Sequence, residues 1–192
     1  MPIGVNAQYH SKVHPGAIAW AVQEPGALEL MQELIIAEKP DVIVELGTCA
    51  GGLTLAMHET RPEAFIFSFD WVIDEGSEFV AWKESGFQQI PRAWFGGQVS
   101  FIKADILGEP WKVSDRMEAR IGTQMLVCDN GNKTQEVRFF GPCLRPGELL
   151  AVHDWGEEIR YEDVAETLAN FEPVWQERCE EMKSLWRFWR RK

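Results

Sequence analysis

A glycine-rich turn is the first feature of the sequence with an evident chemical use. Gly47, Gly51 and Gly52 follow an apolar run at 42–46 and open a segment with helical spacing. Glycine lets a backbone approach a ligand closely, and ligands of open α/β sheets bind at the carboxyl ends of strands. The turn is therefore the first place to look for a bound small molecule.

Four interpretations of this turn compete. A Walker phosphate-binding loop needs a lysine after its last glycine, where this chain has Leu53. A dinucleotide-binding turn needs a second glycine two residues after the first, where the chain has Cys49. A nucleoside-sulfonium site has no pyrophosphate to hold and tolerates a looser glycine pattern, and a plain strand-to-helix turn binds nothing. The two mismatches favour the nucleoside-sulfonium site.

Side chains that bind protons, metals or hydroxyl groups follow the later apolar runs. They are Asp70, Asp105, Asp129, His153 and Asp154, with Lys133 shortly after Asp129. A single carboxylate at the end of a strand is also a common helix cap, so each acid taken alone is ambiguous. Acids at successive strand ends are harder to explain in that way.

The elements that must position these residues alternate along the chain. Short apolar runs with the composition of buried parallel strands cover residues 42–44, 65–69, 99–102, 125–128 and 149–152. Segments with helical spacing lie at 28–35, 53–57, 79–82, 137–140 and 164–168. The tail at 174–176 and 185–189 predicts an antiparallel pair at one sheet edge. Together they predict an α/β fold: a doubly wound, Rossmann-like, mostly parallel seven-stranded sheet with an antiparallel edge strand and helices on both faces.

Length and charge narrow the class of protein. The 192 residues predict one domain, 1–192, and 45% hydrophobic residues suffice for a sizeable core. The net charge of −11 argues against nucleic-acid and anionic-membrane partners, which require a basic face. No apolar stretch is long enough to span a bilayer, and residues 1–12 contain no signal core. The four scattered cysteines fit a reducing cytoplasm, where we expect the protein.

An ordered set of motifs adds a resemblance. Residues 42–48 with Gly51 and Gly52 resemble motif I of class I S-adenosylmethionine-dependent methyltransferases. Residues 39–42 are also similar to one branch of that family, which includes small-molecule O-methyltransferases and cephalosporin-hydroxylase-like proteins. Residues 128–133 and 144–155 are similar to that branch's Asp-Gly-x-His and Leu-x-Pro-Gly-Gly/His-Asp-Trp patterns, so the resemblance covers about 23–155. It implies a fold and a cofactor but no particular substrate.

The resemblance implies a binding site for S-adenosylmethionine. In the family, an acid such as Asp70 accepts hydrogen bonds from the ribose hydroxyls, which suits a carboxylate facing two donors. Trp71 would lie against the adenine ring and Asp105 near its amino group. The N-terminal segment 1–24 is expected to cap the site. The cofactor-binding residues that we predict are Glu45, Gly47, Thr48, Gly51, Asp70, Trp71 and Asp105.

The resemblance also implies a metal site. Metal-dependent members hold a divalent ion by residues that correspond to Asp129, His153 and Asp154. Histidine is a poor magnesium ligand, so manganese or iron fits this set better than magnesium. Such an ion would bind the acceptor hydroxyl and lower its pKa.

A metal-free site remains an alternative. His153 and Asp154 would then form a base pair, with the pKa of His153 near neutrality. Some members carry a catalytic histidine where this chain has Asn132, which leaves neighbouring Lys133 as another candidate base. A hydrogen-bonded structural histidine is the third possibility.

The leading hypothesis is methyl transfer to a hydroxyl of a small molecule. The alternatives are a hydroxylase-like enzyme on the same fold and a cofactor-binding module without methyl transfer. Trp71, Trp82, Trp94 and Trp111 either build an apolar substrate pocket or fill the core. The acceptor and the oligomeric state, including a homo-oligomer, stay open.

Overall fold

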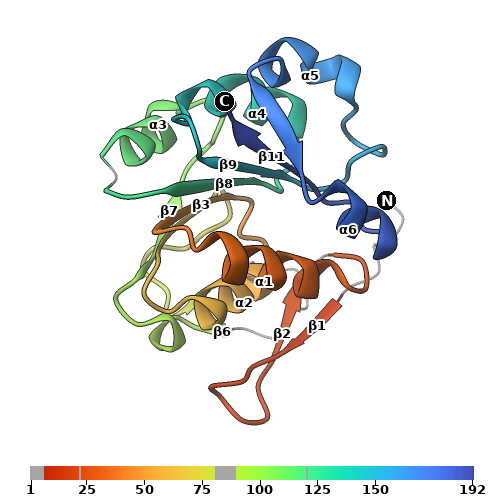
Figure 1. Ribbon diagram of the computed structural model, residues 1–192. Helices are drawn as coiled ribbons and strands as arrows, with labels where there is room; N and C mark the ends of the chain where they lie inside the picture. Colours follow the sequence, from red (N-terminus) through yellow and green to blue (C-terminus); the bar gives the residue numbers. More distant parts are fainter. Residues whose placement is uncertain (1–6, 22, 81–89, 120) are drawn as a thin grey trace.

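A seven-stranded sheet organises the molecule (Figure 1). The computed structural model describes residues 7–21, 23–80, 90–119 and 121–192. The strand order is β10-β11-β9-β8-β3-β4-β7. The strands are β3 (Val42–Leu46), β4 (Phe65–Asp70), β7 (Val99–Lys103), β8 (Gln124–Cys128), β9 (Leu149–Val152), β10 (Phe171–Val174) and β11 (Arg187–Arg191).

Parallel pairing dominates this sheet. The strands from β7 through β4, β3 and β8 to β9 pair in parallel, whereas β11 pairs antiparallel with both β9 and β10. The strand order reverses between β3 and β8, which is where open α/β sheets bind ligands. Pro173 lies in β10 at the sheet edge, where a missing backbone donor is tolerated.

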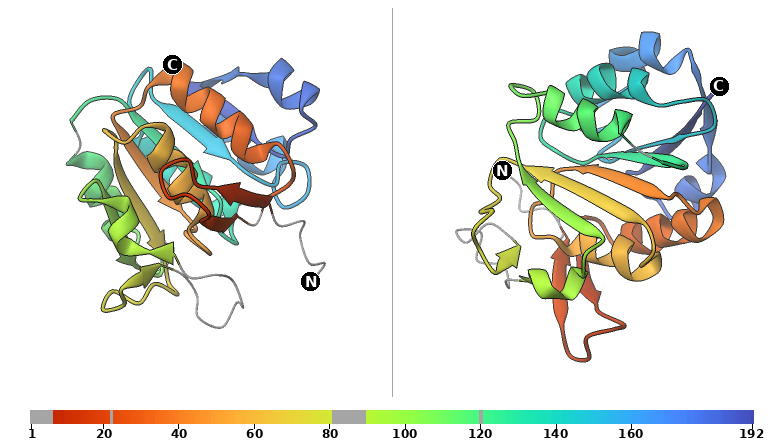
Figure 2. Two further views of the ribbon diagram at one scale, coloured as in Figure 1. Left: turned by 90° about the horizontal axis from the view of Figure 1, so that it is seen from below. Right: turned by 90° about the vertical axis from the view of Figure 1, so that its left-hand side faces the viewer.

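Helices cover both faces of the sheet (Figure 2). On one face lie α1 (Ala27–Glu38), α2 (Gly52–Thr60) and α6 (Gln176–Glu181). On the other lie α3 (Trp111–Glu118), α4 (Lys133–Phe140) and α5 (Tyr161–Leu168). Side chains of β3 alternate between the two cores, Ile43 packing with α1 and α2 and Val44 with the opposite layer. The predicted doubly wound fold is confirmed.

An N-terminal hairpin packs beside α2. It consists of β1 (Ala7–His10) and β2 (Ile18–Ala21), and Tyr9 Oη donates to Glu59 on α2 over 2.9 Å. A Cβ on Gly52, the first residue of α2, would lie 2.2 Å from the Trp20 carbonyl oxygen. Only glycine permits this approach, which brings the hairpin to the carboxyl edge of the sheet.

Two local predictions need correction. The helix expected at 79–82 is wrong where it can be compared, because Phe79–Val80 is a strand, β5, paired with β6 (Ile90–Pro91). Trp82 lies outside the described residues. Three apolar residues are too few to separate helix from strand by spacing.

The tail also differs in detail from its prediction. We expected a strand at 174–176, but β10 ends at Val174 and α6 begins at Gln176. Trp175 between them has φ +62°, and this left-handed backbone turns the chain out of the strand. The short link expected between the two tail strands therefore contains a helix.

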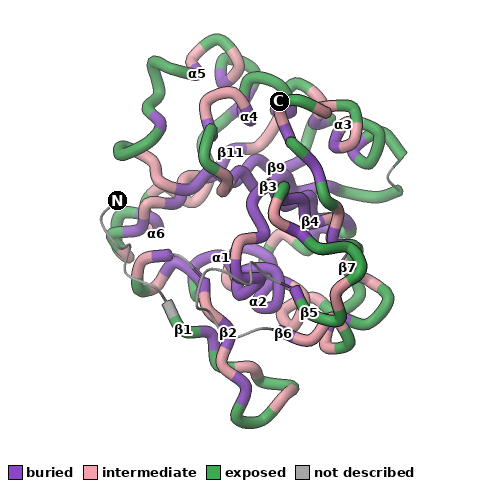
Figure 3. Tube along the Cα trace, turned by 180° about the vertical axis from the view of Figure 1, so that it is seen from behind, coloured by how far each residue is buried: buried purple, intermediate pink, exposed green. Residues whose placement is uncertain are grey.

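The buried part of the chain is concentrated in the sheet, α1 and α2, while the connecting loops are exposed (Figure 3). The four cysteines all lie among the described residues and form no disulfide. Among the described residues, no helix has the length and apolar character needed to cross a membrane. Short 3-10 turns, η2 (Arg92–Phe95) and η3 (Gly141–Cys143), complete the described elements.

Candidate functional site

The carboxyl ends of β3, β4, β8 and β9 border one cleft of about 400 Å³. This volume is in the range of small-molecule sites. The hairpin side of the cleft is formed by Trp20, Ala21 and Gln23. From the strand ends it is lined by Gly47, Thr48, Cys49, Asp70, Trp71, Asp129, Asn130, Gly131, Lys133, Asp154 and Glu158.

The glycine turn brings two strand ends together. Gly47 has φ +102°, and a Cβ there would lie 2.5 Å from the carbonyl oxygen of Asp129. Thr48 is buried, and its hydroxyl shares a 2.5 Å hydrogen bond with Ser68. The backbone of the turn thus lies directly against the end of β8, where the acidic residues begin.

Asp70 closes the same turn from β4. Its Oδ2 accepts from the backbone N–H of Cys49 over 2.9 Å, and its Oδ1 accepts from Val72 N over 3.2 Å. Only 6% of Asp70 is exposed, and that part borders the cleft. Each carboxylate oxygen has a second lone pair available to a ligand hydroxyl.

Trp71 and Asp105 lie at the margin of the cleft. Trp71 is 65% exposed and borders both the cleft and a neighbouring cavity of about 290 Å³. Asp105 lines that second cavity, where its Oδ1 accepts from Gly108 N over 3.0 Å. Both predicted residues therefore lie where one elongated ligand could reach them from Asp70.

Glu45 and Gly51 lie behind the turn and do not line the cleft. Glu45 is fully buried, and its Oε2 accepts from the hydroxyls of Thr54 (2.6 Å) and Ser68. Burial raises the pKa of Glu45 to about 8. Strand alternation explains this placement, since Glu45 faces α2 as Ile43 does. Its contacts support the turn from beneath.

The predicted metal ligands converge. His153 Nδ1 lies 3.0 Å from Asp129 Oδ1 and 3.2 Å from Asp154 Oδ1. One potential ligand atom from each of the three residues lies within 4.8 Å of the other two. Adjacent ligands of one ion, with bonds of about 2.1 Å, are separated by about 3 Å.

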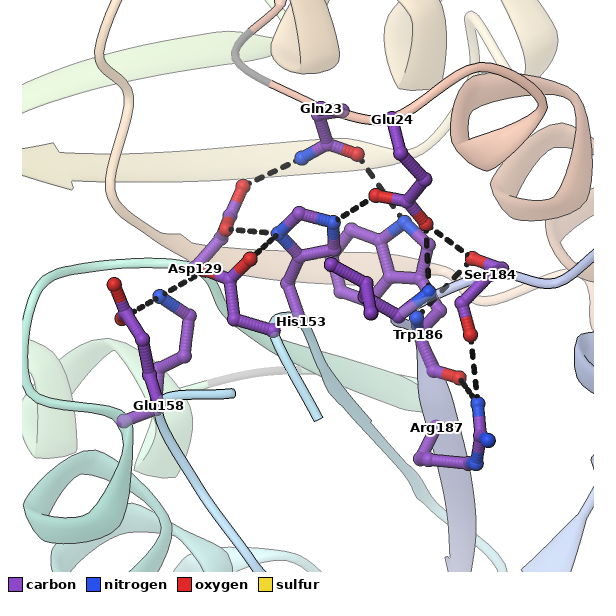
Figure 4. Close-up of polar contacts among 11 residues, drawn as sticks. Gln23, Glu24, Asp129, His153, Glu158, Ser184, Trp186 and Arg187 are labelled. Carbon is purple, nitrogen blue, oxygen red and sulfur yellow. Dashed lines mark hydrogen bonds and ion pairs between the residues drawn. The ribbon is translucent and has the colours of Figure 1, made fainter. Parts of the chain in front are cut away.

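Two residues that the sequence did not indicate complete this group (Figure 4). Glu24 Oε2 lies 2.7 Å from His153 Nε2, and Gln23 Nε2 donates to Asp129 Oδ2 over 2.6 Å. Both residues precede α1 and have no motif around them. Their contacts span more than 100 positions of sequence, so no local pattern could have revealed them.

The donor set fits a divalent transition ion. His153 Nδ1 is buried and has no well-formed hydrogen bond, although two carboxylate oxygens lie near it. A shared cation would satisfy all three atoms at once. One imidazole nitrogen with two carboxylates suits manganese or iron better than magnesium.

The ion-free protein keeps His153 charged. Burial lowers the pKa of His153, but Asp129, Asp154 and Glu24 outweigh it and raise the pKa to about 12. Burial opposes the charge of Glu24 as well, yet its contact with His153 brings the pKa down to about 2. This electrostatic setting is opposite to that of a free histidine base with a pKa near neutrality.

Lys133 is held as an ammonium ion. It is 4% exposed, and Nζ lies 2.7 Å from Asp154 Oδ2 and 2.8 Å from Glu158 Oε2. Burial lowers its pKa, but Asp129, Asp154 and Glu158 reverse that effect and raise it overall. A lysine in this state orients carboxylates and does not accept a proton. Neighbouring Asn132 caps α4 through its side chain.

The tryptophans that the sequence singled out have different surroundings. Trp71 lines the cleft, and so does Trp20, which the sequence did not single out. Trp94 stacks on His14 with ring centroids 4.5 Å apart, and Trp111 is exposed on α3. Of the four tryptophans that the sequence left open between a pocket and the core, Trp71 therefore lines the cleft, and Trp94 and Trp111 do not.

The comparisons with known proteins identify the fold. No family model and no curated protein matches the chain. Its structure resembles the ligand-free structure of CmcI, with a TM-score of 0.65, 13% identity, and coverage of 90% of this chain and 73% of that one. An O-methyltransferase family protein from Burkholderia thailandensis gives a TM-score of 0.51 at 11% identity, over 86% and 55% of the chains.

A third similar structure is a complex. MycE methyltransferase from the mycinamycin biosynthetic pathway, with Mg, S-adenosylhomocysteine and mycinamycin VI, has a TM-score of 0.51 at 14% identity. The match covers 84% of this chain and 48% of MycE, so the chain spans about half of that protein. These likenesses show that the chain shares the α/β fold of these structures.

Proposed function

We propose that the chain is an S-adenosylmethionine-dependent methyltransferase that transfers a methyl group to a hydroxyl of a small molecule with the help of a divalent ion. One observation carries this proposal. The glycine turn, Asp70, Asp129 and Asp154 line the same cleft, and the buried His153 joins Asp129 and Asp154 in one group of potential ion ligands. A nucleoside sulfonium and an acceptor oxygen bound at these two places would meet end to end.

The β3–β4 side of the cleft suits the nucleoside. The free lone pairs of the Asp70 carboxylate would accept hydrogen bonds from the ribose hydroxyls, as expected from the resemblance. Gly47 and Thr48 allow the ligand to lie against the backbone. Trp71 and Asp105 then border the continuation of the ligand toward the second cavity.

The β8–β9 side suits the acceptor. Asp129, His153 and Asp154 would hold the ion, which supplies a lowered pKa at the acceptor hydroxyl when bound. Lys133 holds Asp154 through a 2.7 Å ion pair, and this contact fixes the carboxylate at the cleft wall. Methyl transfer depends on the alignment of nucleophile, carbon and sulfur, so fixed side chains on both sides favour it.

None of the three predicted catalytic residues is a free base in this arrangement. Lys133 is an ammonium ion, and His153 Nε2 is committed to Glu24. Asp154 lines the cleft and faces the proposed ion position through Oδ1. Burial raises the pKa of Asp154, but His153 and Lys133 outweigh it and hold the pKa well below its usual range. Asp154 and His153 would therefore serve as ion ligands and Lys133 as an orienting group, while the acceptor hydroxyl, with its pKa lowered by the bound ion, would lose its proton to water.

Calorimetry with S-adenosylhomocysteine tests the cofactor assignment. We expect saturable binding that Asp70→Ala weakens about 10- to 150-fold, because a charge-assisted hydrogen bond contributes about 1.5–3 kcal/mol. Asp74→Ala is a matched control, since Asp74 also accepts from the backbone N–H two residues ahead but does not line the cleft. Binding of NADH without S-adenosylhomocysteine would contradict the proposal. Dioxygen consumption without methyl transfer would favour the hydroxylase-like alternative.

A further inference from the structure

We propose that Glu24 is a positioning residue for His153: it fixes the imidazole so that Nδ1 faces Asp129 and Asp154, and the site thereby prefers a nitrogen-accepting transition ion to magnesium. This inference rests on the ion site of the proposed function. It concerns a residue outside every motif of the sequence. Its support is the hydrogen bonding of two adjacent residues, Gln23 and Glu24 (Figure 4).

Both oxygens of Glu24 are committed. Oε2 lies 2.7 Å from His153 Nε2, while Oε1 accepts from Ser184 Oγ (2.6 Å) and from the backbone N–H of Leu185 (2.7 Å). An ionised carboxylate only accepts hydrogen bonds. The hydrogen of this contact therefore resides on Nε2, and the segment at 184–185 holds the acceptor in place.

The tautomer of His153 follows from this contact. When an ion replaces the Nδ1 proton, the hydrogen on Nε2 stays with Glu24 and the neutral imidazole presents the lone pair of Nδ1, the atom that faces Asp129 Oδ1 and Asp154 Oδ1. The ring cannot readily turn away, since His153 is 2% exposed and its centroid lies 4.7 Å from that of Trp186. Glu24 thus selects the ligand atom as well as the ring orientation.

Gln23 orients the Asp129 carboxylate in a similar way. Its Nε2 donates to Asp129 Oδ2 over 2.6 Å, and its Oε1 accepts from Trp186 Nε1 over 3.2 Å. The indole N–H only donates and the carboxylate only accepts, so the amide has one consistent orientation. Oδ2 of Asp129 is thereby occupied, which leaves Oδ1 toward His153.

Because metal ions differ in the ligand atoms that they prefer, this geometry should favour some ions over others. Magnesium prefers oxygen ligands, whereas manganese, iron and zinc accept imidazole. A carboxylate behind a ligating histidine fixes its tautomer and raises its basicity, and loss of such a partner costs about 10- to 100-fold in metal affinity. Glu24 should therefore contribute to manganese binding far more than to magnesium binding.

The experiment compares Mn²⁺ and Mg²⁺ affinities of the full chain, by electron paramagnetic resonance titration and by competition. Glu24→Gln has one acceptor oxygen and cannot serve both His153 and Leu185. We expect it to weaken Mn²⁺ binding about 10- to 100-fold with a much smaller change for Mg²⁺. In wild type, pulsed resonance should show the imidazole nitrogen coupled to Mn²⁺, and Glu24→Gln should reduce that signal.

Two further variants test whether the effect is specific to the contact between Glu24 and His153. Glu38→Gln is the matched control, because Glu38 is also a carboxylate with several partners, Trp175 and Arg190, away from the cleft. It should leave both affinities unchanged. Ser184→Ala removes one of the three contacts of Glu24 and should produce a smaller loss for Mn²⁺ in the same direction. It keeps the test decisive if Glu24→Gln does not fold.

The outcomes separate this inference from the proposed function. Unchanged Mn²⁺ affinity in Glu24→Gln, or equal losses for Mn²⁺, Mg²⁺ and S-adenosylhomocysteine, would overturn the positioning role while the ion site stands. A wild type that binds S-adenosylhomocysteine but no Mn²⁺ would overturn both the ion site and this inference. A wild type that binds Mn²⁺ but no S-adenosylhomocysteine would refute methyl transfer alone.

Discussion

The two sides of the cleft are built in different ways. The β3–β4 side consists of a glycine turn and one carboxylate, Asp70, held by backbone N–H groups. The β8–β9 side is a network of ionisable side chains that share partners. Its members are Glu24, Asp129, Lys133, His153, Asp154 and Glu158.

This difference shows where each side is vulnerable. The turn depends on backbone shape, so a change there acts through strain and close contacts. The charged network depends on balance, because removal of one partner leaves another charge buried without compensation. The two sides meet where Gly47 touches the backbone of Asp129.

The largest expected effect comes from that point of contact. Gly47→Ala places a Cβ 2.5 Å from a backbone oxygen of Asp129, at φ +102°. Backbone cannot move aside as a flexible side chain does, so we expect a loss of about 2–4 kcal/mol in unfolding free energy and weakened binding on both sides. Urea denaturation with calorimetry measures both. Gly97→Ala, with open space around it, is the control. Equal behaviour of the two variants would refute the close approach.

Chelation tests whether the two sides of the cleft act independently. If the charged side holds an ion, a chelator should abolish transfer, and manganese should restore it. Asp129→Ala and Asp154→Ala should each lower turnover more than about 100-fold and leave S-adenosylhomocysteine affinity nearly unchanged. Enzyme assays paired with calorimetry provide the measurement. Activity that survives chelation would contradict the ion-assisted route, and a parallel loss of cofactor affinity would show that the sides are coupled.

Glu45 gives the turn a pH dependence of its own. Its pKa is about 8 in the folded protein against an ordinary value of 4.5, so the folded state binds the proton more tightly. The unfolding free energy should therefore fall as pH rises from about 4.5 to about 8. Glu45→Gln should flatten this slope and be more stable than wild type at pH 8 by about 1 kcal/mol or more. Denaturation at a series of pH values yields the difference curve, and parallel curves for the two proteins would contradict the buried placement.

The smallest effect belongs to Asn132, beside the charged side. Its Oδ1 accepts from Gln135 N over 3.4 Å at the start of α4. Asn132→Ala should cost about 0.5–1 kcal/mol of stability as a lost cap. Thermal denaturation and a transfer assay measured on the same variant separate the roles. A large loss of turnover at unchanged stability would show that Asn132 takes part in the reaction, as its position in the motif suggested.

Much of the sheet could be predicted from the chain. The apolar runs that we assigned to five strands all form strands. β3, β8 and β9 are apolar because they are buried along their whole length, whereas β7 lies at the sheet edge and is largely accessible. The helix at 79–82 was wrong, since a short apolar run has no decisive period. The hairpin and α6 were not predicted, and neither was α3, although its buried residues Val113 and Met117 lie four positions apart, the spacing of one helix face.

The candidate site shows the same division. Gly47, Asp70 and Asp129 were expected at strand ends, and parallel strands bring their carboxyl ends to one edge. Glu45 was expected among the cofactor residues, but the structure places it beneath the turn, because neighbouring residues of a strand face opposite sides. Lys133 was a candidate base, but its Nζ donates to the Asn130 carbonyl oxygen and pairs with Asp154 and Glu158, which hold it as an ammonium ion.

The sequence by itself determined the strand–helix alternation, the glycine turn and the supply of acids, because these follow from residue type and short-range spacing. The tertiary structure alone decided which acids face one another. Glu24 meets His153, and Gln23 meets Asp129, only when the segment before α1 folds over the ends of β8 and β9. The charge states of His153 and Lys133 depend on those neighbours, since electrostatic interactions act through space and are strengthened by burial. No spacing along the chain encodes such distances.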